Sequence, residues 1–214
     1  MCIRDSTYTN GVVDQAFSFD PENFAGGYVG IKIPDEPLYQ LTNALTMEGW
    51  IRPRGPGYVV FWRGDERPGL DPFALSLQAN NDLVFELTDT NNNGVSIDTL
   101  LPTNSDGTFM TNWTHVAATW DGSSGNMFLY VNGVLVNQTN TTIVPIGYLS
   151  GDCPALGIGN VADCNNNFGY WGDIDEMSLY TRALSDSEIS AIAQSEYLTG
   201  FPGKFCLLYT SRCV

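Results

Sequence analysis

The strongest structural signal in this chain is the stretch Met127-Phe-Leu-Tyr-Val-Asn-Gly-Val-Leu-Val136. Asn132-Gly133 separates two apolar runs, and both residues accept the positive φ angles that a two-residue type I′ turn requires. The stretch therefore predicts a β-hairpin. A looser turn at residues 121–125 precedes it, so we expect a three-stranded meander from Trp113 to Asn137.

Short apolar or alternating runs recur on both sides of this meander, with turn residues between them. Such spacing is typical of antiparallel strands, and no alternation of strands with long helices appears. The runs expected to form strands outside the meander are Ala16 to Phe19, Tyr28 to Ile33, Thr46 to Ile51, Tyr58 to Trp62, Phe73 to Leu77, Leu83 to Leu87, Val95 to Leu100 and Ile174 to Tyr180. They suffice for two packed antiparallel sheets.

One helix is predicted near the carboxyl end, beginning at Ser185. The Ser185 hydroxyl can accept a hydrogen bond from the amide of Glu188 while the Glu188 carboxylate reaches back, the reciprocal pattern of a capping box. Ile189, Ile192 and Ala193 then fall on one face at helical spacing. We expect a short helix that lies against the sheets.

Composition favours one domain. The chain has 214 residues, with five Trp, ten Tyr and eleven Phe to fill the space between two sheets, and all-β sandwiches of this length commonly form one domain. We expect that domain to span residues 7–198. The ends, 1–6 and 199–214, look like translated adapter peptides and are expected to be non-native or disordered, so Cys2, Cys206 and Cys213 are set aside.

The formal charge is −15, from 24 acidic and 9 basic residues. A phosphate backbone would be repelled, so nucleic acid is not an expected partner. The acidity serves solubility or, alternatively, places loop carboxylates around a hard divalent cation. No stretch approaches the ~20 consecutive apolar residues that span a bilayer, so membrane insertion is not expected.

Cys153 and Cys164 bracket a loop rich in Gly and Asn. A disulfide between them would close a short loop, would contribute about 3 kcal/mol on the chain-entropy model and would indicate an oxidising compartment. The alternative is two unpaired thiols in a cytosolic protein, and no CxxC spacing suggests zinc or redox chemistry. We favour the disulfide and an extracellular or cell-surface location.

Three segments, in order along the chain, resemble the laminin-G-like jelly-roll domains of the concanavalin-A-like lectin/glucanase superfamily, which are related to pentraxins. They are Ala16–Asp20 with Ala44–Pro53, then Trp113–Gly122 with Met127–Val136, then Gly157–Gly159 with Gly172–Tyr180 and Arg182–Ile189. The resemblance implies an all-β fold, a two-sheet antiparallel jelly-roll sandwich with one short C-terminal helix. Such a fold does not by itself identify a ligand.

Calcium is the cofactor that the resemblance to pentraxins implies. Calcium binds about six to eight hard oxygen atoms, and the pentraxin ligands would correspond to Asp71 in one loop and to Asn160 and Asp163 in a second loop. The second loop departs from the pentraxin pattern, because it lacks the Glu-x-Asp arrangement and carries Cys164.

A structural calcium site is the alternative, as in some relatives, and it would use Asp20 and Asp175 with backbone carbonyls. The competing interpretation gives both residues a structural role. In that case Asp20 starts a turn and Asp175 orders the closing strand.

One loop has the residue types of a carbohydrate-binding site. Sugar-binding sites place an aromatic ring against the apolar face of the sugar and amide or carboxylate groups against its hydroxyls. One loop offers this mixture in Asn165, Asn166, Asn167, Phe168, Tyr170 and Trp171. Tyr58 and Trp62 are weaker candidates, because strand aromatics more often belong to the core.

Catalysis is not expected. Glycoside hydrolases of this fold carry paired carboxylates on one strand face as E-x-D-x-x-E, and this triplet is absent from the sequence. The nearest acids are Asp173, Asp175 and Glu176, of which strict alternation turns Glu176 to the opposite face. The one histidine, His115, alternates with strand residues and suits a structural role. The adhesion tripeptide Arg63-Gly-Asp65 is short enough to occur by chance.

The sequence thus favours a non-catalytic extracellular binding or adhesion module that recognises a glycan or an extracellular protein, with calcium possible as an aid, inside a larger multidomain chain. The alternative is a structural spacer domain of a large surface protein. A glycan-active hydrolase on the same fold is the third reading, and it would need an acidic pair that strand alternation does not reveal.

Overall fold

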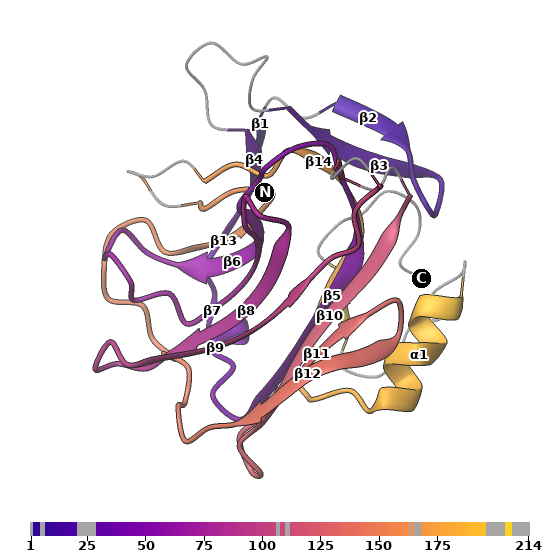
Figure 1. Cartoon of the computed structure of the whole chain (residues 1–214). Helices are drawn as coiled ribbons and strands as arrows, with labels where there is room; N and C mark the ends of the chain where they lie inside the picture. Colours follow the sequence, from indigo (N-terminus) through magenta and orange to yellow (C-terminus); the bar gives the residue numbers. More distant parts are fainter. Residues whose placement is uncertain are drawn as a thin grey trace.

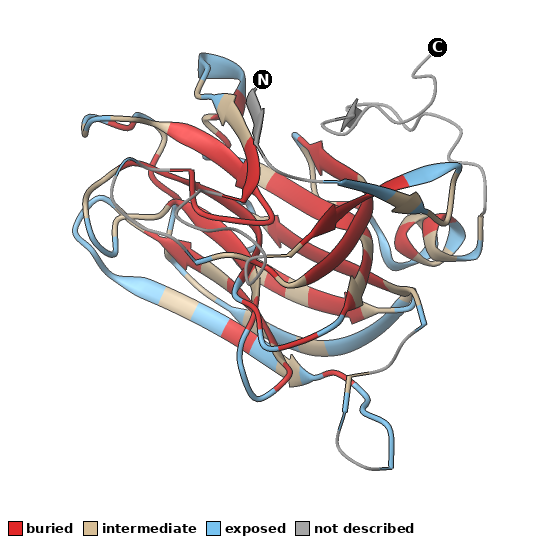
Figure 2. Cartoon of the chain, turned by 90° about the horizontal axis from the view of Figure 1, so that it is seen from above, coloured by how far each residue is buried: buried red, intermediate tan, exposed pale blue. Residues whose placement is uncertain are grey.

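Two antiparallel β-sheets and one short helix make up the computed structural model of the chain (Figure 1). It describes residues 2–4, 7–20, 29–105, 108–109, 112–162, 164, 168–195 and 204–206. Figure 2 shows buried residues concentrated along the strands and exposed residues in the turns and at the rims. The predicted all-β sandwich with one helix near the carboxyl end is confirmed.

The strands divide between a 7-stranded and an 8-stranded sheet. In spatial order the 7-stranded sheet contains β1 (Cys2–Arg4), β4 (Gly30–Pro34), β13 (Ala155–Ile158), β6 (Val59–Gly64), β7 (Phe73–Leu77), β8 (Asp82–Thr88) and β9 (Gly94–Leu100). The 8-stranded sheet contains β12 (Val134–Asn140), β11 (Asn126–Val131), β10 (Thr114–Asp121), β5 (Ala44–Pro53), β14 (Gly172–Tyr180), β3 (Gln15–Phe19) and β2 (Thr7–Asn10), with β15 (Lys204–Cys206) paired to β14 off this path.

Each run predicted as a strand overlaps an observed strand, and β7 matches its prediction at both ends. The hairpin prediction is also confirmed, because Asn132 (φ 50°) and Gly133 (φ 76°) both adopt the positive φ angles of its turn. Strands β1, β2, β13 and β15 were not predicted. All four are short, β1 and β15 lie in the ends that were expected to be non-native or disordered, and β13 has a glycine in its interior, which weakens the pattern of a strand.

The main core lies between the sheets and is built from the inward side chains of both. Large members such as Phe17, Phe61, Phe85 and Trp120 are at most 2% exposed. The η2 3-10 helix (Pro37–Tyr39) leads into β5 and contributes Tyr39 to the same core. The strands that carry the loops described below are therefore fixed by burial on their inner face.

Helix α1 (Asp186–Gln194) packs on the outer face of the 8-stranded sheet (Figure 1). Its capping box forms as predicted: the Ser185 hydroxyl accepts from the amide of Glu188, and the Glu188 carboxylate accepts from the amide of Ser185. Ile189 and Ile192 are buried against Tyr130 and Tyr180. The helix is a fixed part of the sandwich.

His115 has the structural role expected from its place in β10. It is fully buried, with Nε2 3.4 Å from a carboxylate oxygen of Glu48, and the Tyr180 hydroxyl donates to the other Glu48 oxygen at 3.1 Å. The ring of Trp50 meets His115 edge-on. This polar group lies between neighbouring strands, away from the surface.

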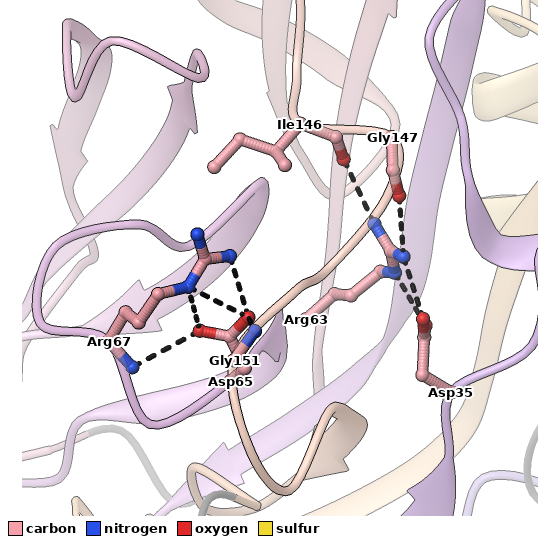
Figure 3. A network of polar contacts seen from close by, with 7 residues as sticks. All are labelled: Asp35, Arg63, Asp65, Arg67, Ile146, Gly147 and Gly151. Atoms are coloured by element: carbon pink, nitrogen blue, oxygen red, sulfur yellow. Dashed lines mark hydrogen bonds and ion pairs between the residues drawn. The ribbon is translucent and has the colours of Figure 1, made fainter.

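A second buried polar network joins β6 to the 146–151 segment (Figure 3). Arg63 is fully buried. It donates to both carboxylate oxygens of Asp35, at 2.7 and 2.9 Å, and to the carbonyls of Ile146 and Gly147. Asp65, 1% exposed, accepts from Arg67 and from the amide of Gly151. The tripeptide Arg63-Gly-Asp65 is thus buried and internally bonded, so an adhesion receptor could not reach it.

The structure joins Cys153, which precedes β13, by a disulfide to Cys164, which follows it, so β13 lies inside the closed loop. Asp163 and the residues 165–167, beside Cys164, lie outside the described residues. Of the cysteines in the ends, Cys2 belongs to β1 and Cys206 to β15, while Cys213 lies outside the described residues. The predicted domain limits at 7 and 198 remain a prediction.

Candidate functional site

Two segments lie side by side where β5 leaves and β14 enters the 8-stranded sheet. Pro53 pairs with Gly172 and Arg52 with Asp173 in the sheet register. Beyond the sheet, the amide of Arg54 donates to the Trp171 carbonyl at 3.0 Å, and the amide of Val59 donates to the Phe168 carbonyl at 3.2 Å. Residues 52–59 and 168–173 therefore form one continuous strip, whose exposed side chains are Arg54, Pro56, Tyr58 and Phe168.

A cleft of about 660 Å³ opens at the Arg52 end of this strip. Its walls come from the strip itself, from Thr9 of β2 and from the connection between β9 and β10. The lining residues that carry chemistry are Arg52, Arg54, Asn104, Phe109, Trp171 and Asp173. The cleft thus combines two cations, one carboxylate, one amide and two aromatic rings.

The wall at Trp171 is held by close packing against glycine. A Cβ on Gly55 would meet the Trp171 ring, and a Cβ on Gly57 would approach the Trp171 backbone to 2.9 Å. The sequence Arg54-Gly-Pro-Gly57 therefore lets the chain pass beside the indole without a side chain in between. The ring keeps part of its surface exposed.

The two arginines differ in how they are engaged. Arg52 donates through Nε to Asp173 Oδ2 at 2.9 Å, and its guanidinium carbon lies 4.7 Å from the centre of the Trp113 ring. Arg54 donates through Nη2 to the Ser18 hydroxyl at 2.9 Å and to the Phe19 carbonyl at 3.0 Å. The Arg52 side chain is 27% exposed and that of Arg54 is 41% exposed.

Two polar atoms at this site are buried and lack a hydrogen-bond partner among the described residues. One is Asp173 Oδ1, which has Arg54 Nη2 at 3.6 Å as an ion-pair neighbour. The other is the Tyr170 hydroxyl. Burial, with the charge of Asp173 as a second cause, raises the pKa of Tyr170 well above its ordinary value, so this hydroxyl stays protonated.

An exposed aromatic pair marks the other end of the strip. Tyr58 is 48% exposed and Phe168 is 44% exposed, and their ring centroids lie 5.8 Å apart in an edge-on arrangement. Exposed aromatic rings side by side offer apolar faces that a ligand can cover.

The structure separates the residues predicted to bind carbohydrate. Phe168 and Trp171 lie on the strip, and Asn165, Asn166 and Asn167 lie outside the described residues. The prediction for Tyr170 is wrong as a surface contact, because its ring is fully buried in the main core. Successive side chains of an extended segment point to opposite sides, so Tyr170 points into the core where Trp171 points into the cleft.

Two of the three residues predicted to bind calcium, Asn160 and Asp71, lie in the described part of the chain. Asn160 is fully buried, donates to the Val29 carbonyl at 3.0 Å and accepts from the Phe168 amide at 2.8 Å. Its side-chain amide therefore orders the strip from inside the protein. Asp71 lies half-buried against Gly64, and Asp163 lies outside the described residues.

Of the alternative calcium pair, Asp20 and Asp175, the structure shows Asp175 bonded to the backbone. Both oxygens of the fully buried Asp175 accept from backbone amides, those of Val12 and Val13 at 2.8 and 3.0 Å and that of Glu176 at 2.9 Å. Burial raises the pKa of Asp175. Within the described ranges no group of three or more His, Cys, Asp or Glu side chains is placed to hold a metal ion.

Sequence reasoning missed the two arginines of the cleft. A signal was present, because Arg52 and Arg54 account for two of only nine basic residues and stand two positions apart at the end of a strand, next to Gly-Pro-Gly. Residues two apart on a strand share a face. Their meeting with Asp173, more than a hundred residues later, depends on the pairing of β5 with β14.

A family model described as the concanavalin A-like lectin/glucanases superfamily, of laminin-G type, matches residues 25–190. The chain belongs to this superfamily. A curated relative, the sushi, von Willebrand factor type A, EGF and pentraxin domain-containing protein 1 of Rattus norvegicus, is 28% identical over 134 residues. The match covers 58% of this chain and 4% of that multidomain protein.

Solved structures of the superfamily fold resemble the chain at low identity. The binding domain of botulinum neurotoxin serotype G has a TM-score of 0.67 and 15% identity, covering 90% of this chain and 45% of that one. The Ruminococcus gnavus sialidase module CBM40, bound to α2,6-sialyllactose, has a TM-score of 0.61 and 18% identity, covering 77% and 96%. A leech intramolecular trans-sialidase scores 0.64 at 18% identity, covering 80% of this chain and 27% of that one.

Among the residues that the structure describes, no helix has the length and apolarity to cross a membrane.

Proposed function

We propose that this superfamily member is a non-catalytic glycan-binding module whose ligand lies on the strip formed by residues 52–59 and 168–173. The observation that carries the proposal is the cleft beside Trp171, where an aromatic ring, two arginines and an amide meet. Sugar rings offer an apolar face to an aromatic ring and hydroxyls to polar groups, so this mixture suits them.

The two aspartates of β14 support binding over hydrolysis. Asp173 is 2% exposed and bonded to Arg52, and Asp175 is fully buried and bonded to backbone amides. A hydrolase needs two carboxyl groups that both reach the scissile bond. These two carboxylates are committed to the structure, which favours a module without covalent chemistry.

The relatives give independent support. The Ruminococcus gnavus module of similar fold is bound to sialyllactose, and the botulinum structure is a binding domain. The rat relative carries its matching region within a much longer chain. An extracellular or cell-surface module of a multidomain protein is the setting that we propose, and the Cys153–Cys164 disulfide is compatible with it.

Calcium assistance is a separate proposal, confined to the loop through Asp71 and the neighbourhood of Asp163. Carboxylate oxygens are suitable calcium ligands. Asn160 would then act only by ordering the loop, because its amide is already bonded on both sides.

The test is titration of an immobilised panel of oligosaccharides with the full chain and with three alanine variants. We expect Trp171→Ala and Tyr58→Ala to weaken the binding of any captured glycan by about tenfold, because each removes an apolar surface for the sugar. Tyr148→Ala is the matched control, since Tyr148 is 74% exposed and does not line the cleft.

Two outcomes oppose the proposal. If no oligosaccharide binds the folded wild-type chain, the result favours the alternative function of a structural spacer domain. If Tyr148→Ala weakens binding as much as Tyr58→Ala does, the ligand lies elsewhere on the surface. Each variant is first compared with the wild type in thermal unfolding, because Trp171 also packs against Gly55.

A further inference from the structure

We propose that the cleft recognises the carboxylate of an acidic sugar, with Arg54 as the residue that binds it. The inference rests on the proposed glycan-binding function and names the class of sugar. It is argued from the charge, the exposure and the existing bonds of the side chains that line the cleft.

The sign of the local charge is opposite to that of the whole chain. The formal net charge is −15, yet the charged side chains lining the cleft are Arg52, Arg54 and Asp173, two positive and one negative, which leaves +1. A net positive cleft on an acidic protein attracts an anion only at short range, because the surrounding charge repels it at longer distance. One carboxylate matches this balance better than a polyanion.

Arg54 is the arginine that can still bind a ligand. The guanidinium of Arg52 is enclosed between Asp173 and the Trp113 ring. In the described structure Arg54 makes its hydrogen bonds through Nη2 alone, to Ser18 and Phe19. These two bonds orient the group, and with 41% of the side chain exposed the remaining N–H donors can pair with a carboxylate.

The rest of the cleft matches the remainder of a sugar. Asp173 is 2% exposed and holds the two arginines in place, with Oδ2 bonded to Arg52 and Oδ1 3.6 Å from Arg54 Nη2. It would also repel a second anionic group, which distinguishes a singly charged sugar from a sulfated polymer. Trp171 and Phe109 provide apolar walls for the ring face.

The experiment measures binding of three soluble probes by calorimetry: 3′-sialyllactose, a glucuronate-terminated disaccharide and neutral lactose. Wild type is compared with Arg54→Gln, with Arg54→Lys and with Lys32→Gln. The last variant removes one positive charge from β4 of the other sheet, outside the cleft. Binding of the acidic probes is repeated at low and high salt.

We expect the acidic probes to bind wild type more tightly than lactose. Arg54→Gln should weaken acidic binding by about 10- to 100-fold and lactose binding by less than about threefold, because only the acidic probes lose a charge-assisted bond. Arg54→Lys should retain part of the affinity, and Lys32→Gln all of it. Which of the two acidic probes binds identifies the source of the carboxylate.

Opposite results separate the two proposals. If lactose binds wild type as tightly as the acidic probes, and Arg54→Gln changes neither, glycan binding stands and the carboxylate inference is overturned. If no probe binds wild type, both are overturned. If Arg54→Gln does not fold, two measurements on the wild type decide the inference. They are the affinity for acidic probes compared with neutral lactose, and the weakening of acidic binding by salt.

Discussion

Arg63 is a fully buried arginine that bonds Asp35 and the carbonyls of Ile146 and Gly147, so a single side chain ties three segments together. Arg67 is also paired with an aspartate, but its side chain is 31% exposed and water can replace its bonds. The two residues stand four positions apart and carry the same charge. Comparing the stabilities of variants at these two positions therefore tests how much the burial of an arginine adds to the effect of its charge.

We predict that Arg63→Ala lowers the free energy of unfolding by about 3–5 kcal/mol, because it leaves Asp35 and two buried carbonyls without a partner. Arg67→Ala should cost less, about 1–3 kcal/mol, because the buried Asp65 keeps the hydrogen bond from the Gly151 amide. Burial raises the pKa of Asp65, but the hydrogen bonds from Arg67 and Gly151 lower it below its ordinary value. Urea unfolding of both variants measures the difference. Equal losses would contradict the role of burial.

At the scale of the element, the start of α1 depends on a carboxylate. Glu188 closes the capping box with Ser185 and also pairs with Arg182 at 2.7 and 2.9 Å. The hydrogen bond from Arg182 is the largest cause that lowers the pKa of Glu188 from 4.5 to about 2. The charged form is therefore favoured by folding.

The sign of the pH effect follows from this depressed pKa. The contribution of Glu188 is fully present above pH 4.5 and is lost as pH falls from 4.5 towards 2. Because the pair lies near the surface, we expect it to amount to about 1 kcal/mol. At pH 7, Glu188→Gln should therefore have a lower thermal midpoint than the wild type, and at pH 2 the two midpoints should be nearly equal. Circular dichroism measures both midpoints. A difference between them that is the same at every pH would contradict this.

In strand β14, the alternation of side chains expected from the sequence is interrupted. Strict alternation places Asp173 and Asp175 on one face and Glu176 on the other, but the register shifts between Asp175 and Ser178, and Glu176 has a φ of 50°. Such a bulge is set by the amides that Asp175 accepts from Val12 and Val13, far away in the sequence. Periodicity cannot reveal it.

At the scale of the whole molecule, a ligand that binds only the native state raises the thermal midpoint. If the loop through Asp71 binds calcium, a concentration of about 100 times the dissociation constant should stabilise the chain by about 2.7 kcal/mol and raise the midpoint by about 5–10 °C. A chelator should reverse the shift, and Asp71→Asn should abolish it. A midpoint that is the same with calcium and with chelator would remove calcium from the proposed function.

The sequence by itself determined the fold class, most of the strands, the hairpin at Asn132-Gly133 and the capped helix. These features depend on residues close together in the chain, whose turn geometry, alternation and capping act locally. It also placed Phe168 and Trp171 on one loop, as residues expected to bind a ligand.

Only the tertiary structure decided the composition of the cleft. The pairing of β5 with β14 brings Arg52 and Arg54 to Asp173, and the packing of the sheets encloses Tyr170 while leaving Trp171 at the surface. Contacts between residues more than a hundred positions apart depend on strand order and register. No local pattern encodes these, because each strand alone could pair with several partners.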